Sequence, residues 1–156
     1  MSERAKQPNS LHCFVCGLEN PVGLRLAFYG VEQDEVVSEI VLPAHYQGYP
    51  GIVHGGIVAS MLDEVVGRAA MGDDDTHFMM TARLKIRYRK PVPVEQPLRL
   101  IGKLVQRHGK VTEARGEVWL PDGSLGAEAE AVLVDIPDLP GEAVDWESLG
   151  WKVYPD

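Results

Sequence analysis

Apolar residues in the middle of the chain recur at every third or fourth position, which is typical of a helix with one buried face. The stripe follows His54 and consists of Val58, Met61, Leu62, Val65 and Ala69. Gly72 and the three aspartates after it interrupt the pattern, and a glycine at this point favours helix termination. We therefore predict one substantial helix over residues 54–71.

Elsewhere the apolar residues alternate with polar ones or form short runs, a pattern that predicts β-strands. The predicted strands cover residues 24–30, 34–42, 78–90, 97–108, 110–120 and 124–136. A turn signal, Pro121-Asp122-Gly123, separates the last two. Successive strands joined by tight turns pair in antiparallel fashion. One helix against one large antiparallel sheet is an α+β fold.

The length of 156 residues corresponds to about one domain. We divide it into a lead-in (residues 1–23), a central domain (residues 24–136) and a tail that packs on the surface (residues 137–156). No apolar stretch approaches the ~18 residues of a membrane helix, and the N-terminus lacks the apolar core of a signal peptide. The net charge of −8 argues against a nucleic-acid partner. We expect a cytoplasmic protein that does not contact membranes.

Asp63 lies on the side of the predicted helix away from the apolar stripe, roughly 150° from its centre. Its neighbours on this face are all small: Gly56, Ala59, Ser60 and Gly67. Such a face lets a partner subunit or a thin substrate approach the backbone closely. We interpret Asp63 as a candidate catalytic carboxylate; the plainer alternative is a solvated helix acid. Glu64 lies roughly 100° further round. It is the second candidate carboxylate and a substrate-binding candidate, or else a solvated acid or a member of an ion pair.

The helix opens with His54-Gly55-Gly56. The first N–H groups of a helix have no intrahelical partner, and the helix dipole suits them to stabilise a carbonyl oxygen that gains negative charge. Gly55 or Gly56 would let a substrate reach the backbone. We expect His54 to position the loop through a hydrogen bond; direct participation in catalysis and a plain packing role are the alternatives. Asp63 follows His54 by nine residues, about 13 Å along the helix axis. We therefore expect the helix start and Asp63 to belong to different active sites, each completed by another copy of the chain.

Cys13 and Cys16 are the two cysteines of the chain. Their Cys-x-x-Cys spacing resembles half of a zinc site, with His12 as a candidate third ligand, but no second pair follows. A redox role would need the pair at a helix start after a strand, whereas Pro21 and Gly23 follow here. We interpret the cysteines as two small buried thiols and expect no metal.

Four blocks of sequence carry a resemblance to a known family. They are Cys13-Phe14-Val15-Cys16-Gly17 with Asn20-Pro21 and Gly23-Leu24; Tyr46-Gln47-Gly48-Tyr49-Pro50-Gly51; His54-Gly55-Gly56 with Asp63-Glu64; and Thr81-Ala82 with Tyr88-Arg89-Lys90-Pro91. In these blocks, which span about half of the residues, the chain resembles the hotdog-fold acyl-CoA thioesterases, in the PaaI-like branch. His-Gly-Gly alone is a weak signal, but all four blocks in the right order are a strong one.

The resemblance implies a long helix wrapped by a curved antiparallel sheet, and a homodimer or homotetramer with active sites between subunits. It implies hydrolysis of an acyl-CoA to a free acid and coenzyme A, without a metal or cofactor. The family's catalytic carboxylate, a general base or a nucleophile, corresponds to Asp63, and a contributing Thr or Ser corresponds to Thr81. Some branches carry an asparagine where this chain has Gly48, beside Gln47; we take both residues as substrate-binding candidates.

Cations alternate with apolar residues along the strand predicted over residues 78–90. They are Arg83, Lys85, Arg87 and Arg89, and Lys90 follows them. The period of two places the four alternating cations on one face of the sheet. This stripe could bind the phosphates of coenzyme A, with Arg89 and Lys90 as the best contacts, or it could form salt bridges with acids on adjacent strands.

Three alternative functions are weighed against a thioesterase. A hotdog dehydratase or isomerase would pair a catalytic histidine with an acid in another arrangement. A non-catalytic acyl-CoA-binding protein would act as a sensor, with a DNA-binding or signalling element attached. A zinc-stapled interaction module would need a second pair of ligands.

Overall fold

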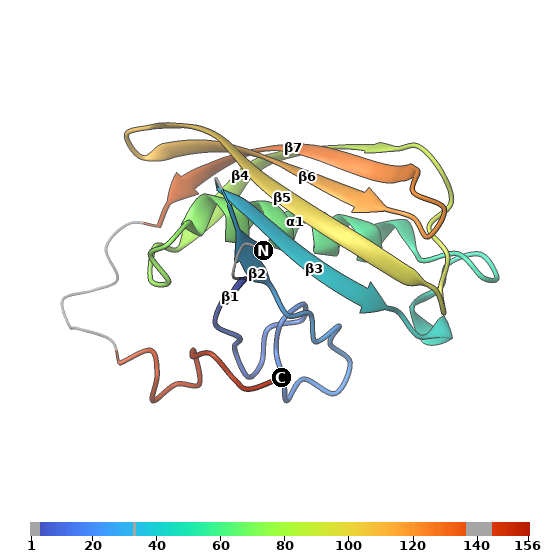
Figure 1. Cartoon of the computed structure of the whole chain (residues 1–156), viewed down its shortest axis with the longest axis horizontal. Helices are drawn as coiled ribbons and strands as arrows, with labels where there is room; N and C mark the ends of the chain where they lie inside the picture. The colour runs from blue at the N-terminus through green and yellow to red at the C-terminus, as the bar shows by residue number, and fades with distance from the viewer. Residues whose placement is uncertain (1–3, 33, 137–144) are drawn as a thin grey trace.

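The computed structural model describes residues 4–32, 34–136 and 145–156. Within them, a curved antiparallel sheet wraps one side of helix α1 (Gly55–Met71), as Figure 1 shows. The strands are β1 (Ala5–Lys6), β2 (Tyr29–Val31), β3 (Glu35–Val41), β4 (Met79–Tyr88), β5 (Pro97–His108), β6 (Val111–Trp119) and β7 (Leu125–Asp135), and a short 3-10 helix, η1 (Ala44–Tyr46), follows β3. The sheet order is β1-β2-β3-β5-β6-β7-β4, so β4 forms one edge. The predicted α+β architecture is confirmed.

The core lies between α1 and the sheet. The predicted apolar stripe of the helix is at most 1% exposed: Val58, Met61, Leu62, Val65 and Ala69. Gly102 on β5 and Gly116 on β6 lie directly against the helix. A Cβ atom on Gly102 would be 2.4 Å from the carbonyl oxygen of Val65, and one on Gly116 would be 3.1 Å from the Val65 side chain. The helix therefore approaches the sheet so closely that these positions have little room for a side chain.

One predicted strand, over residues 24–30, is largely wrong, because only its last two residues join a strand, β2. Alternate side chains in this stretch are buried, as in a strand: Leu24, Leu26 and Phe28. The backbone, however, is bonded to the lead-in, since Leu24 N donates to Phe14 O at 2.8 Å and Leu26 N donates to Val15 O at 2.9 Å. The alternation thus reflects an extended segment that packs on the core without a neighbouring strand. The other predicted elements are confirmed to within two residues at each end.

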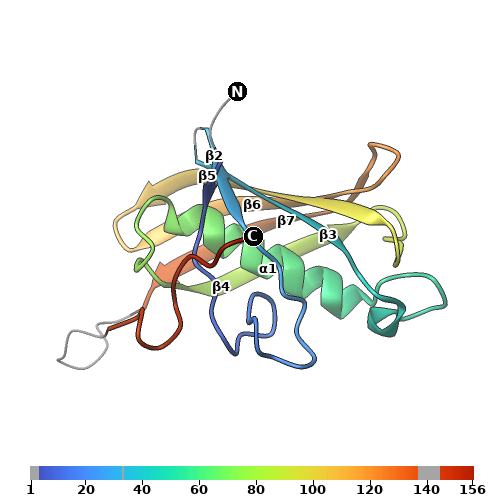
Figure 2. The ribbon, with the colours of Figure 1, turned by 60° about the horizontal axis from the view of Figure 1, so that its bottom comes forward.

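The lead-in and the tail lie against part of the side of α1 that the sheet leaves open (Figures 1 and 2). The two segments are joined at Asn9, whose backbone N–H donates to Lys152 O at 2.9 Å. Residues 137–144 of the predicted tail lie outside the described residues. In the described part of the chain, no helix is long and apolar enough to cross a membrane.

The substitution Gly102→Ala tests the close contact between helix and sheet. Because the new Cβ would lie 2.4 Å from the Val65 carbonyl oxygen, the helix or the strand must shift, and we expect the free energy of unfolding to fall by ~1–3 kcal/mol. Urea unfolding followed by circular dichroism measures this change. Gly30→Ala, on β2, is the matched control, since its Cβ would lie at an ordinary 3.7 Å from Ala5 O. Equal stability of the two variants would contradict the contact.

Candidate active site

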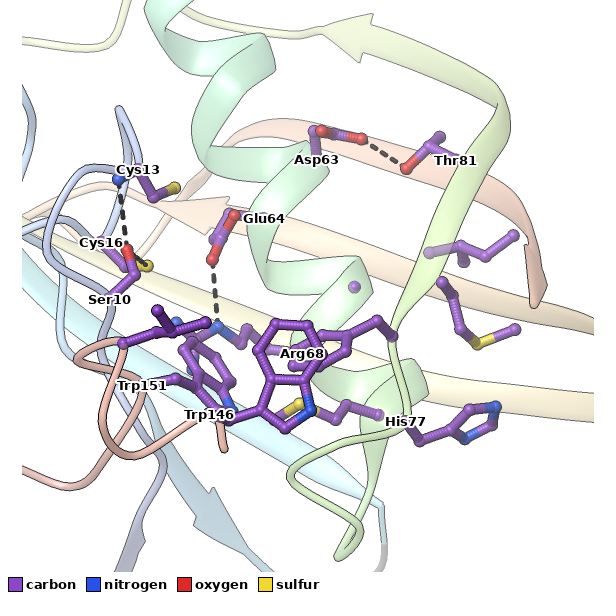
Figure 3. A pocket seen from close by; sticks show the side chains of 16 residues that line it. Ser10, Cys13, Cys16, Asp63, Glu64, Arg68, His77, Thr81, Trp146 and Trp151 are labelled. Carbon is purple, nitrogen blue, oxygen red and sulfur yellow. Dashed lines mark hydrogen bonds and ion pairs between the residues drawn. The ribbon is translucent and has the colours of Figure 1, made fainter. Parts of the chain in front are cut away.

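Asp63 lies on the exposed face of α1 and is bonded to the edge strand β4. The hydroxyl of Thr81 donates to Asp63 Oδ1 at 2.6 Å, as Figure 3 shows. The second carboxylate oxygen, Oδ2, has no hydrogen-bond partner among the described residues. The carboxylate is thus held in one orientation and keeps one oxygen available for a ligand.

A β-bulge in β4 brings Thr81 to the helix side of the sheet. The register with β7 shifts between Thr81, which is opposite Leu133, and Arg83, which is opposite Val132, so Ala82 is the extra residue. Strict alternation would place Thr81 on the outer face with Arg83. The bulge reverses the direction of the side chains that precede it, and the sequence pattern alone did not predict it.

Asp63 and Thr81 line a cavity of about 400 Å³. Its apolar walls include Met71, Phe78, Met79, Leu133, Trp146 and Trp151. Phe78 makes edge-to-face contacts with both tryptophans, with ring centroids 4.8 Å from Trp146 and 5.5 Å from Trp151. The tail therefore supplies a wall of the cavity, a role that the sequence pattern did not predict for these tryptophans. The tryptophans contact Phe78, which is about seventy residues away in the sequence, and no local sequence pattern predicts such a contact.

The start of α1 lies in a separate hollow of about 720 Å³, bordered by Tyr88. His54 is the N-cap of the helix, and its Nδ1 accepts a hydrogen bond from Gly56 N at 2.9 Å. The N–H of Gly55 has no hydrogen-bond partner among the described residues, and the carbonyl of Gly55 accepts from the Tyr88 hydroxyl at 2.8 Å. The available donor at the helix start therefore belongs to Gly55, because the N–H of Gly56 is occupied by the cap.

Gln47 and Gly48 shape the loop that leads into the helix. Gln47 Oε1 accepts from Gly51 N at 3.0 Å, and Gly51 turns the chain with a positive φ of 81°. A Cβ atom on Gly48 would lie 3.3 Å from His54 Cα. A longer side chain at Gly48, such as the asparagine of related branches, would press on His54.

Two cations at the end of the basic stripe lie beside one acid of β7. Arg87 is opposite Glu128 in the strand register, and Arg89 forms an ion pair with the same Glu128 at 2.9 Å. The ion pair favours the salt-bridge interpretation for Arg89, whereas Arg83, Lys85 and Arg87 form no ion pair within the described residues. Arg89 and Lys90 also border the hollow at the helix start, and Lys90 forms no ion pair within the described ranges.

Glu64 faces the lead-in, whereas Asp63 faces β4 (Figure 3). Arg68 Nε donates to Glu64 Oε1 at 3.0 Å, so Glu64 is ion-paired rather than solvated. Burial raises the pKa of Glu64 to about 7, although the charge of Arg68 opposes this shift. Arg68 is itself only 3% exposed and donates through Nη1 to Pro8 O at 2.6 Å.

The two cysteines are free thiols beside Glu64. Cys16 is buried, as predicted, while Cys13 is partly exposed. A hydrogen bond with Cys16 lowers the pKa of Cys13 to about 6, against the opposing effect of burial. His12, the third ligand considered from the sequence, is exposed and is not part of this group.

Comparisons with known proteins agree with this architecture. A family model described as the thioesterase superfamily matches residues 50–127, half of the chain, including the helix start, Asp63 and Thr81. The mouse (Mus musculus) protein named acyl-coenzyme A thioesterase THEM4 is 33% identical over 141 residues, which are 88% of this chain and 60% of that protein. This chain therefore spans about three fifths of the length of that relative.

Solved structures extend the comparison to the fold. The crystal structure of RHA08564, a thioesterase superfamily protein, is 35% identical with a TM-score of 0.74, and the match covers 80% of this chain and 60% of that one. The Escherichia coli PaaI protein shares the fold at 13% identity with a TM-score of 0.66, over 73% of this chain and 81% of its own. The hotdog fold expected from the resemblance is confirmed, and this chain belongs to the thioesterase superfamily.

Proposed function

We propose that this chain is an acyl-CoA thioesterase, which hydrolyses a thioester to a free acid and coenzyme A at a site shared between two copies of the chain. The observation that supports the proposal most directly is the carboxylate of Asp63, oriented by Thr81 at the mouth of an apolar cavity. The name of the mouse relative, an acyl-coenzyme A thioesterase, supports the same reaction.

The proposed catalytic carboxylate and the proposed N–H donor to the carbonyl oxygen lie in different hollows of one chain. Asp63 lines the apolar cavity, and Gly55 lines the hollow at the helix start. Asp63 follows Gly55 by eight positions, which places the two backbones about 12 Å apart along α1. A single chain therefore cannot bring both groups to one carbonyl carbon.

A two-fold dimer would solve this problem through its symmetry. If two α1 helices pack side by side in opposite directions, a register that sets Asp63 beside the partner's Gly55 also sets Gly55 beside the partner's Asp63. Ala59, midway between the two, would then lie on the axis. The neighbouring face is small and at least partly exposed, and the adjacent edge strand β4 exposes 57% of Met80. A homotetramer would contain two such dimers.

In the proposed mechanism, the thioester carbonyl oxygen accepts a hydrogen bond from the Gly55 N–H at the positive end of the helix dipole. One such donor is worth roughly 3 kcal/mol of transition-state stabilisation. Asp63 either removes a proton from an attacking water or attacks the carbonyl carbon itself, in which case water hydrolyses the resulting anhydride. In both routes a C–O bond replaces the C–S bond, and the coenzyme A thiolate leaves and is protonated.

The surroundings suggest where the two parts of the substrate lie. The cavity beside Asp63 is lined by Met71, Phe78 and tail residues such as Trp146, which suits an acyl group. Arg89 and Lys90 border the hollow at the helix start, which suits the phosphates of coenzyme A.

Substitutions at the two half-sites test the mechanism. Asp63→Asn should lower kcat at least ~100-fold by removing the base or nucleophile. Gly55→Pro should lower kcat by ~100–1000-fold, because proline lacks the N–H but fits the first helical position, and the preceding His54 already has the required extended ψ of 137°. Gly55→Ala, which keeps the N–H, should retain more activity than Gly55→Pro. Thiol release from a panel of acyl-CoAs measures turnover, and near-normal kcat in folded Asp63→Asn or Gly55→Pro would refute the assigned role.

The Thr81 hydroxyl is tested by two matched variants. Thr81→Val keeps the shape of the side chain but cannot donate to Asp63, so the carboxylate loses its orientation and kcat should fall ~10–100-fold. Thr81→Ser keeps the donor and should retain most of the activity. Both variants are compared in the same thiol-release assay, and equal activity would show that the hydrogen bond is not needed for turnover.

Mixing the two inactive variants tests the shared site. Each proposed site combines Asp63 of one chain with Gly55 of the other. In a heterodimer of Asp63→Asn with Gly55→Pro, one site therefore contains both substitutions and the other contains neither. After subunit exchange, random pairing should restore about a quarter of the wild-type activity. Each variant taken alone through the same exchange is the control. If the mixture stays as inactive as its components although heterodimers form, each site lies within one chain.

A further inference from the structure

We propose that Cys13, Cys16 and Glu64 bind a zinc ion that fastens the lead-in to helix α1. The sulfur atoms of the two cysteines and a carboxylate oxygen of Glu64 all lie within 4.8 Å of one another. Figure 3 shows the three side chains converging from the lead-in and the helix. The sequence offers one ligand pair, from which we expected no metal; the fold brings the third ligand from a distant position.

The distances between the ligand atoms suit zinc after small movements. Zinc bonds to thiolate sulfur at about 2.3 Å and to carboxylate oxygen at about 2.1 Å, and tetrahedral coordination then puts neighbouring ligand atoms roughly 3.5–3.8 Å apart. Atoms that already lie within 4.8 Å need side-chain rotations on the order of 1 Å. The thiolates favour zinc over calcium or magnesium, which prefer oxygen ligands.

The turn that carries the cysteines is held in place by its own hydrogen bonds. Gly17 N donates to Cys13 O at 2.8 Å, and a Cβ atom on Gly17 would lie 2.3 Å from that oxygen. Val15 N donates to Cys13 Sγ at 3.4 Å, and Cys13 N donates to Ser10 Oγ at 3.2 Å. An N–H group directed at a sulfur stabilises the thiolate form that a metal requires.

Arg68 prepares Glu64 for the role of ligand. It binds one carboxylate oxygen, Oε1, at 3.0 Å, and the other oxygen has no hydrogen-bond partner in the described part of the chain. Arg68 is fixed in turn by Pro8 O at 2.6 Å and by the rings of Phe28 and Trp151, 4.7 and 4.9 Å from its guanidinium carbon. A carboxylate oriented in this way matches the hydrogen-bonded carboxylates of known metal sites.

The charges of the group balance once zinc is bound. Two thiolates and the Glu64 carboxylate carry three negative charges, which match the zinc ion together with Arg68. Binding would release the two thiol protons to solvent. A water molecule or the hydroxyl of Ser10, 3.4 Å from Cys16 Sγ, would take the fourth position. The three ligands line the same cavity as Asp63, but Asp63 is held separately by Thr81, so the ion would form part of the cavity wall.

The test uses the whole protein, reduced and freed of metal by a chelator, and then titrated with zinc chloride. We expect one zinc per chain by elemental analysis, a higher melting temperature, and a thiolate-to-metal charge-transfer band when cobalt(II) replaces zinc. Cys16→Ser and Glu64→Gln should each weaken zinc binding by ~100-fold or more, since even residues that only support a ligand contribute ~10–100-fold. His12→Asn and Glu19→Gln, which alter exposed side chains of the lead-in, should bind zinc as the wild type does.

A second measurement covers variants that fail to fold. In the wild-type protein, bound zinc should protect Cys13 and Cys16 from alkylation by iodoacetamide. Unchanged alkylation at saturating zinc, or full zinc binding by the Cys13→Ser/Cys16→Ser double variant, would overturn the proposal. Loss of both thiols to a disulfide in the absence of reductant, with no zinc bound by the reduced form, would also overturn it and indicate a redox pair. None of these results depends on thioesterase activity.

Discussion

The close contact between α1 and the sheet is the constraint on which the rest of the structure depends. Gly102 and Gly116 let the helix backbone approach the strands, with the carbonyl of Val65 directly above Gly102. This contact fixes the rotation of the helix about its axis, because only the apolar stripe can face the sheet. The positions of all other helix side chains follow from this rotation, and among them are the two neighbouring carboxylates, Asp63 and Glu64.

Rotation of roughly 100° per residue gives these two carboxylates different environments. Asp63 turns toward β4, where the bulge at Ala82 supplies the hydroxyl of Thr81. Glu64 turns toward the lead-in, where Arg68 pairs with it in a largely buried setting. One carboxylate is therefore open to a ligand from the cavity, and the other is part of the attachment between the helix and the lead-in. The two carboxylates thus line one cavity with different partners, Thr81 for Asp63 and Arg68 for Glu64.

The sequence predicted the features that depend on residues close together along the chain. The helix and its buried stripe follow from a period of 3.6 residues, and the long strands follow from alternation. The strand expected over residues 24–30 was wrong because its backbone partners lie in the lead-in. Thr81 was identified through the family resemblance; strict alternation would have placed it with the outward cations, since a bulge depends on the partner strand. Glu64 and the cysteines are close in space but about fifty residues apart in the sequence. No local pattern in either segment predicts that they are neighbours.

A rigid helix also limits how the proposed site can be completed. The Gly55 N–H and Asp63 are about 12 Å apart on one straight element, so no loop movement within the chain brings them together. The proposed association of two copies would do so, and symmetry would then create two sites at once. The lead-in and the tail lie against only part of the open side of α1, and the face with Ala59 and Ser60 stays at least partly exposed. Fastening the lead-in at Glu64 would therefore support catalysis indirectly, by holding the cavity wall while the dimer face stays accessible.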